Sequence, residues 1–327
     1  VNSMTTDFKA MRVTALAGGV GGAKLALGLQ LALAPGNLTV IVNTGDDFEH
    51  FGLAISPDVD TVCYTLAGKA NTEKGWGLQG ESWNVLTALK ALSAPTWFQL
   101  GDQDLATHLE RTRLLQAGWS LSQVTEHFCK LWQVSSHVLP MSDQPFRTLI
   151  RTQTGELLAF QEYFVRERCE PAVAEIMFQH AEDIQPAPQV LNAIEAADLV
   201  VICPSNPWVS IDPIIALPGM VPALKKKPVI AVSPIIQGKT VKGPAAKMAR
   251  ELGLEASAAA VLGHYVDFVN GFIYDQLDGD IFTSDAYPGI IKKATNTIMK
   301  NDEDKLRLAI ETLMLGEFLI NNIYHHD

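Results

Sequence analysis

The feature that most constrains the fold of this 327-residue chain is a glycine-rich turn near its N-terminus. Residues 12–17 form a short, mostly apolar run, the sequence GGVGGAK follows at 18–24, and apolar residues then recur at helical spacing until Pro35. This order predicts a strand, a tight turn and a helix. Since residues 38–42 form a second apolar run, we expect a βαβ unit of a parallel sheet with a right-handed crossover.

Two later apolar runs repeat the pattern. Residues 198–203 and 228–233 each read as a buried strand followed by a polar loop and a helix. In an open parallel sheet the ligand crevice lies beyond the carboxyl ends of the strands, so the loops after residues 17, 42, 203 and 233 should converge. The predicted fold class is α/β: a Rossmann-like, doubly wound, mainly parallel sheet with an inserted smaller cap.

The middle of the chain departs from this pattern. Residues 75 to about 132 are rich in tryptophan and helical periodicity, while residues 138–178 break into short segments of β-type spacing. We therefore expect a Rossmann-like nucleotide-binding core made of residues 10–70 and 190–327, with residues 71–189 as the inserted cap.

Charge and composition limit the partners. The chain carries 25 Lys and Arg against 36 Asp and Glu, a net charge of −11, which argues against binding nucleic acid or acidic membranes. No stretch reaches the ~20 apolar residues of a membrane span, and the first residues do not resemble a secretion signal. The four cysteines lie far apart without a CxxC pair, which predicts buried thiols. A soluble, cytoplasmic protein is expected.

The glycine turn has the context of an anion site, because helix N-termini offer free backbone N–H groups. It does not match the dinucleotide fingerprint, since Lys24 replaces the third glycine and the second strand ends in Asn43 instead of an acid. It does not match a P-loop, since Leu25 follows Lys24. A merely tight turn is the alternative, although four glycines in five residues exceed what a turn requires.

An acidic loop follows the second strand. Asp46, Asp47 and Asp60 lie within reach of the first turn, and carboxylates combined with substrate phosphate oxygens suit Mg²⁺. Alternatively, Asp46 is a turn residue and Asp58 a helix N-cap, which leaves Asp47 and Asp60 without a role. His50 either orients a substrate hydroxyl or lies at the surface.

Several motifs together resemble one known family, the 2-phospho-L-lactate transferases, which make the phosphodiester of coenzyme F420. The motifs are GGVGGAK at 18–24, NTGDD at 43–47, SPDVDT at 56–61, GWG at 75–77, WFQLGDQDLATH at 97–108, LPMSD at 139–143, PSNP at 204–207 and SPIIQGK at 233–239. They span about residues 12 to 250, so the resemblance covers most of the chain.

The resemblance implies a Mg²⁺-dependent reaction between a GDP-activated three-carbon acid and the ribityl 5′-hydroxyl of the deazaflavin FO, with release of GMP, in a protein that tends to form homodimers. The cap would contribute the deazaflavin pocket. Asp46 and Asp60 would bind the metal, and Asp47 could accept the ribityl proton. The expected substrate-binding residues are Gly19, Gly21, Gly22, Lys24, Asn43, His50, Trp83, Asp104, Ser205, Asn206 and Lys239.

Within that set, the glycines would hold the nucleotide phosphates, and Ser205 and Asn206 would contact the nucleotide. Trp76, Trp83 and Trp97 are candidates for the walls of a flat ring pocket, or else form the core of the cap. Asp104 and His108 lie one helical turn apart, as either a ligand contact or an ion pair.

Two other classes stay open. A nonenzymatic regulator that binds nucleotide sugars could use the same core and glycine turn. An NAD-dependent dehydrogenase is disfavoured by Lys24 and Asn43. Which three-carbon acid is used, whether phospholactate, phosphoenolpyruvate or phosphoglycerate, is not decided by the sequence.

Overall fold

The fold is built on one central parallel sheet. The computed structural model describes residues 8–324 apart from 180–182, 280 and 283–285. Seven strands pair in the order β14-β13-β10-β9-β1-β2-β5, and every pairing is parallel. The strands are β1 (Val13–Ala17), β2 (Leu38–Val42), β5 (His137–Pro140), β9 (Leu199–Ile202), β10 (Val229–Val232), β13 (Gly271–Asp275) and β14 (Ile291–Thr295). The predicted α/β class is confirmed.

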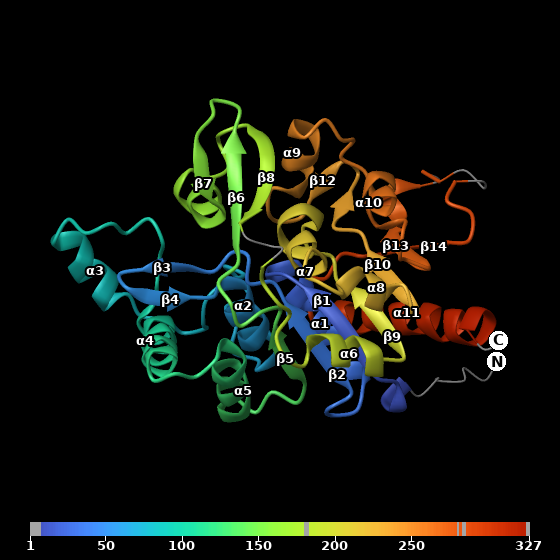
Figure 1. Ribbon diagram of the computed structural model, residues 1–327, viewed down its shortest axis with the longest axis horizontal. Helices are drawn as coiled ribbons and strands as arrows, with labels where there is room; N and C mark the ends of the chain where they lie inside the picture. The colour runs from blue at the N-terminus through green and yellow to red at the C-terminus, as the bar shows by residue number, and fades with distance from the viewer. Residues whose placement is uncertain (1–7, 180–182, 280, 283–285, 325–327) are drawn as a thin grey trace.

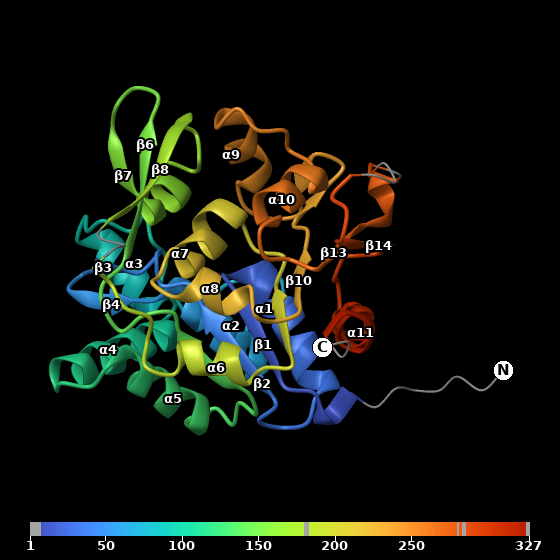
Figure 2. The same ribbon diagram turned by 45° about the vertical axis from the view of Figure 1, so that its right-hand side comes forward.

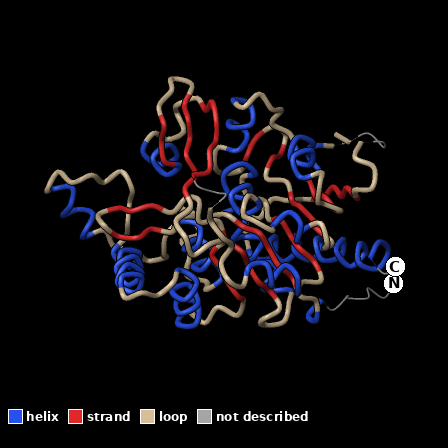
Figure 3. Tube along the Cα trace, in the orientation of Figure 1, coloured by secondary structure: helices blue, strands red, loops and turns tan. Residues whose placement is uncertain are grey.

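The central strands β1, β2, β9 and β10 are almost entirely apolar because helices cover both faces of the sheet (Figures 1 and 3). Alternate residues enter two separate cores: Leu16 of β1 and Ile202 of β9 belong to one, Ala15 and Val201 to the other. The second core is covered by α1 (Val20–Ala32), α2 (Pro57–Leu66) and α11 (Asp302–Leu319). The first is covered by α6 (Val190–Ala196), α7 (Asp212–Ile215), α8 (Met220–Leu224), α9 (Ala245–Glu251) and α10 (Ala258–Tyr265).

The segment expected to form one cap divides into two parts, because β5 within it pairs with β2 of the main sheet. On one side lie α3 (Asn84–Ala91) and α4 (Asp102–Gln116), next to the hairpin of β3 (Phe48–His50) and β4 (Leu53–Ile55). On the other, β6 (Arg147–Thr152), β7 (Leu157–Ala159) and β8 (Val173–Gln179) form a separate three-stranded sheet (Figures 1 and 2). Between them, α5 (Leu121–Leu131) packs on β5.

Short elements complete the chain. A hairpin of β11 (Ile235–Ile236) and β12 (Lys239–Thr240) follows β10, and η2 (Glu162–Arg166) is a π-type turn between β7 and β8. The others are η1 (Phe8–Ala10), η3 (Pro207–Ile211), η4 (Gln276–Asp278) and η5 (Ile320–Tyr324). Among the described residues, no helix is both long and apolar enough to cross a bilayer.

Candidate functional site

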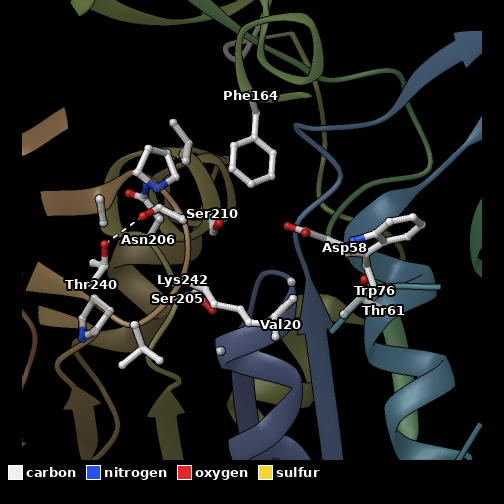
Figure 4. Close-up of a pocket in the computed structure, with 18 of the residues that line it drawn as sticks. Val20, Asp58, Thr61, Trp76, Phe164, Ser205, Asn206, Ser210, Thr240 and Lys242 are labelled. Carbon is white, nitrogen blue, oxygen red and sulfur yellow. Dashed lines mark hydrogen bonds between the residues drawn. The ribbon is translucent and has the colours of Figure 1, made fainter. Parts of the chain in front are cut away.

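A cavity of about 730 Å³ lies at the carboxyl ends of the central strands. Gly19 follows β1, Asp46 follows β2, Ser205 follows β9 and Ser233 follows β10, and all four line the cavity. The loops that the sequence predicted to converge therefore meet at one place. Residues from both parts of the expected cap, among them Trp76 and Phe164, complete the wall (Figure 4).

The glycine turn brings the start of α1 to the floor of this cavity. A Cβ at Gly21 would overlap the Pro204 carbonyl oxygen. A Cβ at Gly22 would lie only 2.5 Å from Ser205 Oγ and 2.9 Å from Ala17 Cβ. The turn is therefore free of side chains because the loop after β9 packs directly against it. Gly18 donates its N–H to Ser205 Oγ at 2.9 Å.

The N-terminus of α1 is also uncapped. No side chain accepts a hydrogen bond at its N-cap, Gly19, and its first turn contains no acid. Free N–H groups at the start of a 13-residue helix offer an anion site. Gly19, Gly21 and Lys24 line the cavity, whereas Gly22 faces the loop behind it.

Two carboxylates, Asp46 and Asp58, face the cavity beside this turn. Asn43 Nδ2 donates to both, to Asp46 Oδ1 at 3.1 Å and to Asp58 Oδ2 at 3.0 Å. Burial raises the pKa of Asp58 to about 6, against the opposing effect of its hydrogen bonds from Asn43 and Gly19. Burial and the Asp58 charge raise the pKa of Asp46 well above its usual value. Asn43 itself does not line the cavity but holds the two acids together.

This pair suits a hard divalent cation. Two buried carboxylates that repel each other are stabilised by a positive charge placed between them. Within the described ranges, no group of three or more His, Cys, Asp or Glu side chains could hold a metal ion. A cation bound here would therefore take its remaining ligands from substrate oxygens and water, which is the usual coordination of Mg²⁺ in proteins.

The structure places Asp60 elsewhere. It forms an ion pair with Arg111 and lies 3.7 Å from His108 Nδ1, and it is not among the cavity-lining residues. Residues two apart on a helix differ by about 200° in direction, so Asp58 and Asp60 of α2 cannot face the same side. The expected metal ligand Asp60 is thus replaced at the cavity wall by Asp58. Ser56, not Asp58, occupies the N-cap position of α2.

Asp47 also points away from the cavity. Its Oδ2 accepts a hydrogen bond from Ser56 Oγ at 2.8 Å, and burial raises its pKa to about 8. Asp46 lines the cavity, whereas Asp47 does not. The geometry gives no support to Asp47 as the acceptor of a substrate proton.

Asp104 belongs to a buried network that joins α2 to α4. It accepts a hydrogen bond from Tyr64 Oη at 2.7 Å, and His108 Nε2 lies 3.5 Å from it. Arg111 contacts both His108 and Asp60. Burial raises the pKa of Asp60, and the charges of Arg111 and His108 oppose that rise. These residues, which we call the α2–α4 network, contact one another and do not line the main cavity.

Aromatic side chains make up the wall on the cap side. The lining aromatics are Trp76, Trp97, Phe98, Phe160 and Phe164. Trp83 lies behind Trp76 at 6.3 Å between ring centroids, and Lys74 Nζ lies 4.0 Å over its ring. His50 packs edge-on against Trp97 at 5.3 Å. Neither Trp83 nor His50 reaches the cavity, because other aromatic rings stand between.

The opposite wall carries polar groups among apolar ones. Ser205 and Asn206 line it, as do Thr240 and Lys242 from the segment after β11 (Figure 4). Lys239 is exposed and does not line the cavity, since consecutive strand residues point to opposite faces and Thr240 takes the inner one. On the floor, Lys24 donates from Nζ to the Met299 carbonyl at 2.9 Å.

Sequence reasoning missed several lining residues. Asp58 is apparent in the sequence, but the helical phase that turns it toward the cavity was not part of the prediction. Gln161, Phe164 and Arg168 lie in an irregular segment without a recognisable motif, and Met299 follows the edge strand β14. Only knowledge of the strand order could have brought Met299 to the site.

The fold and the site define an α/β protein with a helix N-terminus that no side chain caps and an acidic pair at the carboxyl edge of its sheet. Residues 13–308 match the family model described as 2-phospho-L-lactate transferase CofD, and the chain belongs to this family of transferases. The resemblance drawn from the sequence motifs is confirmed.

Relatives and solved structures agree with this assignment. A phosphoenolpyruvate transferase of Streptomyces griseus is 42% identical over 314 residues, covering 94% of this chain and 99% of the relative. A 2-phospho-L-lactate transferase of Methanospirillum hungatei is 39% identical over 303 residues, covering 92% and 99%. A crystal structure of a UPF0052 family member from Bacillus halodurans has a TM-score of 0.61 at 17% identity, covering 93% of this chain and 99% of that one, which shows a shared fold.

Proposed function

We propose that the protein transfers a phospho-three-carbon-acid group from its GDP-activated form to the ribityl 5′-hydroxyl of FO, releasing GMP, in coenzyme F420 biosynthesis. The observation that carries the proposal is one cavity with two chemically different walls that meet at Asp46 and Asp58. Its volume of about 730 Å³ is within the usual range for sites that enclose small molecules.

The polar wall suits the activated nucleotide. The uncapped start of α1 would receive the phosphates, and Lys24 and Lys242 would add positive charge beside them. Ser205 and Asn206 supply hydrogen-bonding groups from the loop after β9. In a chain of net charge −11 an anionic ligand has to be held by such local groups.

The aromatic wall suits the acceptor. A deazaflavin ring is flat and mostly apolar, and Trp76 and Phe164 offer ring faces on two sides of the cavity (Figure 4). Both of these side chains are more than a third exposed, so their surfaces are available to a ligand. The acceptor would then extend its ribityl chain toward the acidic pair.

The transfer replaces one phosphorus–oxygen bond by another. The ribityl oxygen attacks the phosphorus that carries the acid, the bond to the bridging oxygen breaks, and GMP leaves with that oxygen. Catalysis of such a reaction depends chiefly on aligning the attacking hydroxyl with the phosphorus and on neutralising the charge of the phosphate oxygens. Asp46 and Asp58 would hold Mg²⁺, which supplies positive charge to the phosphate oxygens when bound. The start of α1 would fix the diphosphate and the aromatic wall the acceptor.

The proposed donor is a GDP-activated three-carbon acid, with the individual acid left open. Relatives named phosphoenolpyruvate transferase and 2-phospho-L-lactate transferase are 42% and 39% identical, a difference too small to choose between the two acids.

The proposal is tested by incubating the protein with FO, Mg²⁺ and each of three GDP esters, of lactate, enolpyruvate and glycerate, and separating the products. A phosphodiester of FO should appear together with an equal amount of GMP. Omission of Mg²⁺ should abolish both products. If the protein leaves FO unchanged with all three esters but binds a UDP-sugar, it is a regulator with the same core and the proposal is wrong.

A further inference from the structure

One face of an irregular segment forms the roof of the cavity. Its members are Phe160, Gln161, Phe164, Val165 and Arg168, which recur at roughly helical spacing through η2. The rings of Phe160 and Phe164 stack at 5.6 Å, and Gln161 Nε2 lies 3.5 Å from Asp46 Oδ2. This roof segment therefore runs from the acidic pair to the edge of the cavity, where Arg168 lies.

The opposite side of the roof segment is anchored to the core. Tyr163 is fully buried, and its Oη receives a hydrogen bond from Lys247 Nζ of α9 at 3.2 Å. The same ammonium donates to the Pro171 carbonyl at 3.0 Å and pairs with Glu251. These contacts tie the chain to α9 on both sides of Arg168.

The backbone at the end of the roof segment is unusual. Arg168 and Cys169 have φ angles of 52° and 58°, in the left-handed region that non-glycine residues rarely adopt. The Cys169 N–H donates to the Tyr163 carbonyl at 2.9 Å, which holds the chain in this conformation. A glycine would fit here with less strain.

Of the four basic residues that line the cavity, Arg168 is the one whose side chain makes no hydrogen bond or ring contact within the described part of the chain. Lys24 donates to the Met299 carbonyl, Lys242 to the Lys74 carbonyl, and Lys74 lies over the Trp83 ring. Arg168, by contrast, has no ion pair or side-chain hydrogen bond within the part of the chain that the structure describes.

A nearby arginine shows the ordinary arrangement. Arg166 lies on the same segment but does not line the cavity, and it pairs with Glu162 at 2.7 Å and Glu167 at 2.8 Å. Arg168 thus places an exposed guanidinium without an ion pair among the described residues at the lining of the cavity.

We propose that Arg168 binds the carboxylate of the activated three-carbon acid, a role that rests on the proposed transferase function. Each acid in the class carries a carboxylate beside the transferred phosphate, and a guanidinium matches a carboxylate with two parallel hydrogen bonds. The phosphates would occupy the start of α1, so the carboxylate would extend toward the roof. Arg168 binds the carboxylate that all the candidate acids share, and other residues distinguish one acid from another.

The test compares two ligands that differ only at this group. One is the lactate ester of GDP, and the other is the isopropyl ester, in which a methyl group replaces the carboxylate. Dissociation constants of both are measured by calorimetry for the wild type, Arg168→Ala and the matched control Arg166→Ala. The wild type should bind the lactate ester about 10-fold to 100-fold more tightly than the isopropyl ester, as expected for a charge-assisted hydrogen bond.

In Arg168→Ala this preference should disappear, while the affinity for GDP itself stays at the wild-type level. Arg166→Ala should keep the preference. Arg168→Gly keeps the test independent of folding, because glycine accepts the left-handed backbone. It should melt at or above the temperature of Arg168→Ala and should also lose the preference.

Three outcomes would overturn the assignment. A preference that survives in Arg168→Ala would show that another group binds the carboxylate. A large fall in GDP affinity in Arg168→Ala would place the guanidinium on the nucleotide phosphates. If the wild type binds neither ester nor GDP, the proposed function fails, and the role of Arg168 fails with it.

Discussion

The acidic pair at the cavity and the α2–α4 network each take one aspartate from α2, yet the charges of these two aspartates are balanced in different ways. Asp58 and Asp60 both lie on α2 and are both buried. Asp60 is joined to Arg111, whereas Asp58 shares an amide with a second carboxylate, Asp46. The network carries its own cation, whereas no basic side chain forms an ion pair with Asp46 or Asp58 among the described residues. Under the proposed function, Mg²⁺ would supply the positive charge at the acidic pair.

The largest effect is expected when the buried cation of the α2–α4 network, Arg111, is removed. Replacing Arg111 with Met leaves Asp60 and Asp104 without a compensating charge in a buried site. We expect the free energy of unfolding to fall by about 3–5 kcal/mol, as for other broken buried ion pairs. Urea denaturation measures the change. A fall below about 1 kcal/mol would show that the network does not depend on Arg111.

The second effect is on the pH dependence of stability. The pKa of Asp58 is raised to about 6 and that of Asp47 to about 8, while unfolded Asp titrates near about 3.9. Between these values the folded chain binds protons that the unfolded chain has released, so the free energy of unfolding decreases as pH rises from about 4 to about 8.

Urea denaturation across this pH range checks the slope. Mg²⁺ together with GDP should make it shallower, since a bound cation favours the charged carboxylates. If the free energy of unfolding instead rises with pH over the same range, the raised pKa values of Asp58 and Asp47 are contradicted.

A smaller effect is expected from Tyr64→Phe. The substitution removes the 2.7 Å hydrogen bond from Tyr64 Oη to Asp104 and leaves the ring packed against Trp132. Loss of a hydrogen bond to a charged group should lower the free energy of unfolding by about 1.5 kcal/mol. Affinity for GDP should not change, because neither residue lines the cavity. A loss of GDP affinity without a loss of stability would place this pair in the binding site.

The smallest change in stability is expected from Gly19→Ala. The added Cβ would lie 2.7 Å from Asp58 Oδ1, so the carboxylate must move while the backbone stays in place. The free energy of unfolding should change by less than about 1 kcal/mol, since only one side chain shifts. The gain in GDP affinity on addition of Mg²⁺ should nevertheless fall. An unchanged Mg²⁺ effect would mean that the position of Asp58 is unimportant.

The sequence predicts the site well where local pattern decides it. The apolar runs and the glycine turn locate the βαβ unit, and the rule for parallel sheets brings Gly19, Asp46 and Ser205 together. Family motifs then indicate the chemistry. These steps succeed because each depends on neighbours along the chain or on a general property of parallel sheets.

Other features depend on distant packing and were not predictable in the same way. The choice between Asp58 and Asp60 depends on the phase of α2, which starts at Pro57 after Ser56. The division of the cap follows from the pairing of β5 with β2, far away in the sequence. Arg168 ends an irregular turn held by Tyr163 and α9, for which no local pattern exists.

The most direct test of the account measures GDP affinity with and without Mg²⁺ in Asp58→Asn and in Asp60→Asn. In Asp58→Asn, Mg²⁺ should no longer tighten GDP binding, although the protein stays folded. In Asp60→Asn, the folded protein should be less stable but should still respond to Mg²⁺. If Asp60→Asn loses the response to Mg²⁺ and Asp58→Asn retains it, the acidic pair at the cavity is not the cation site.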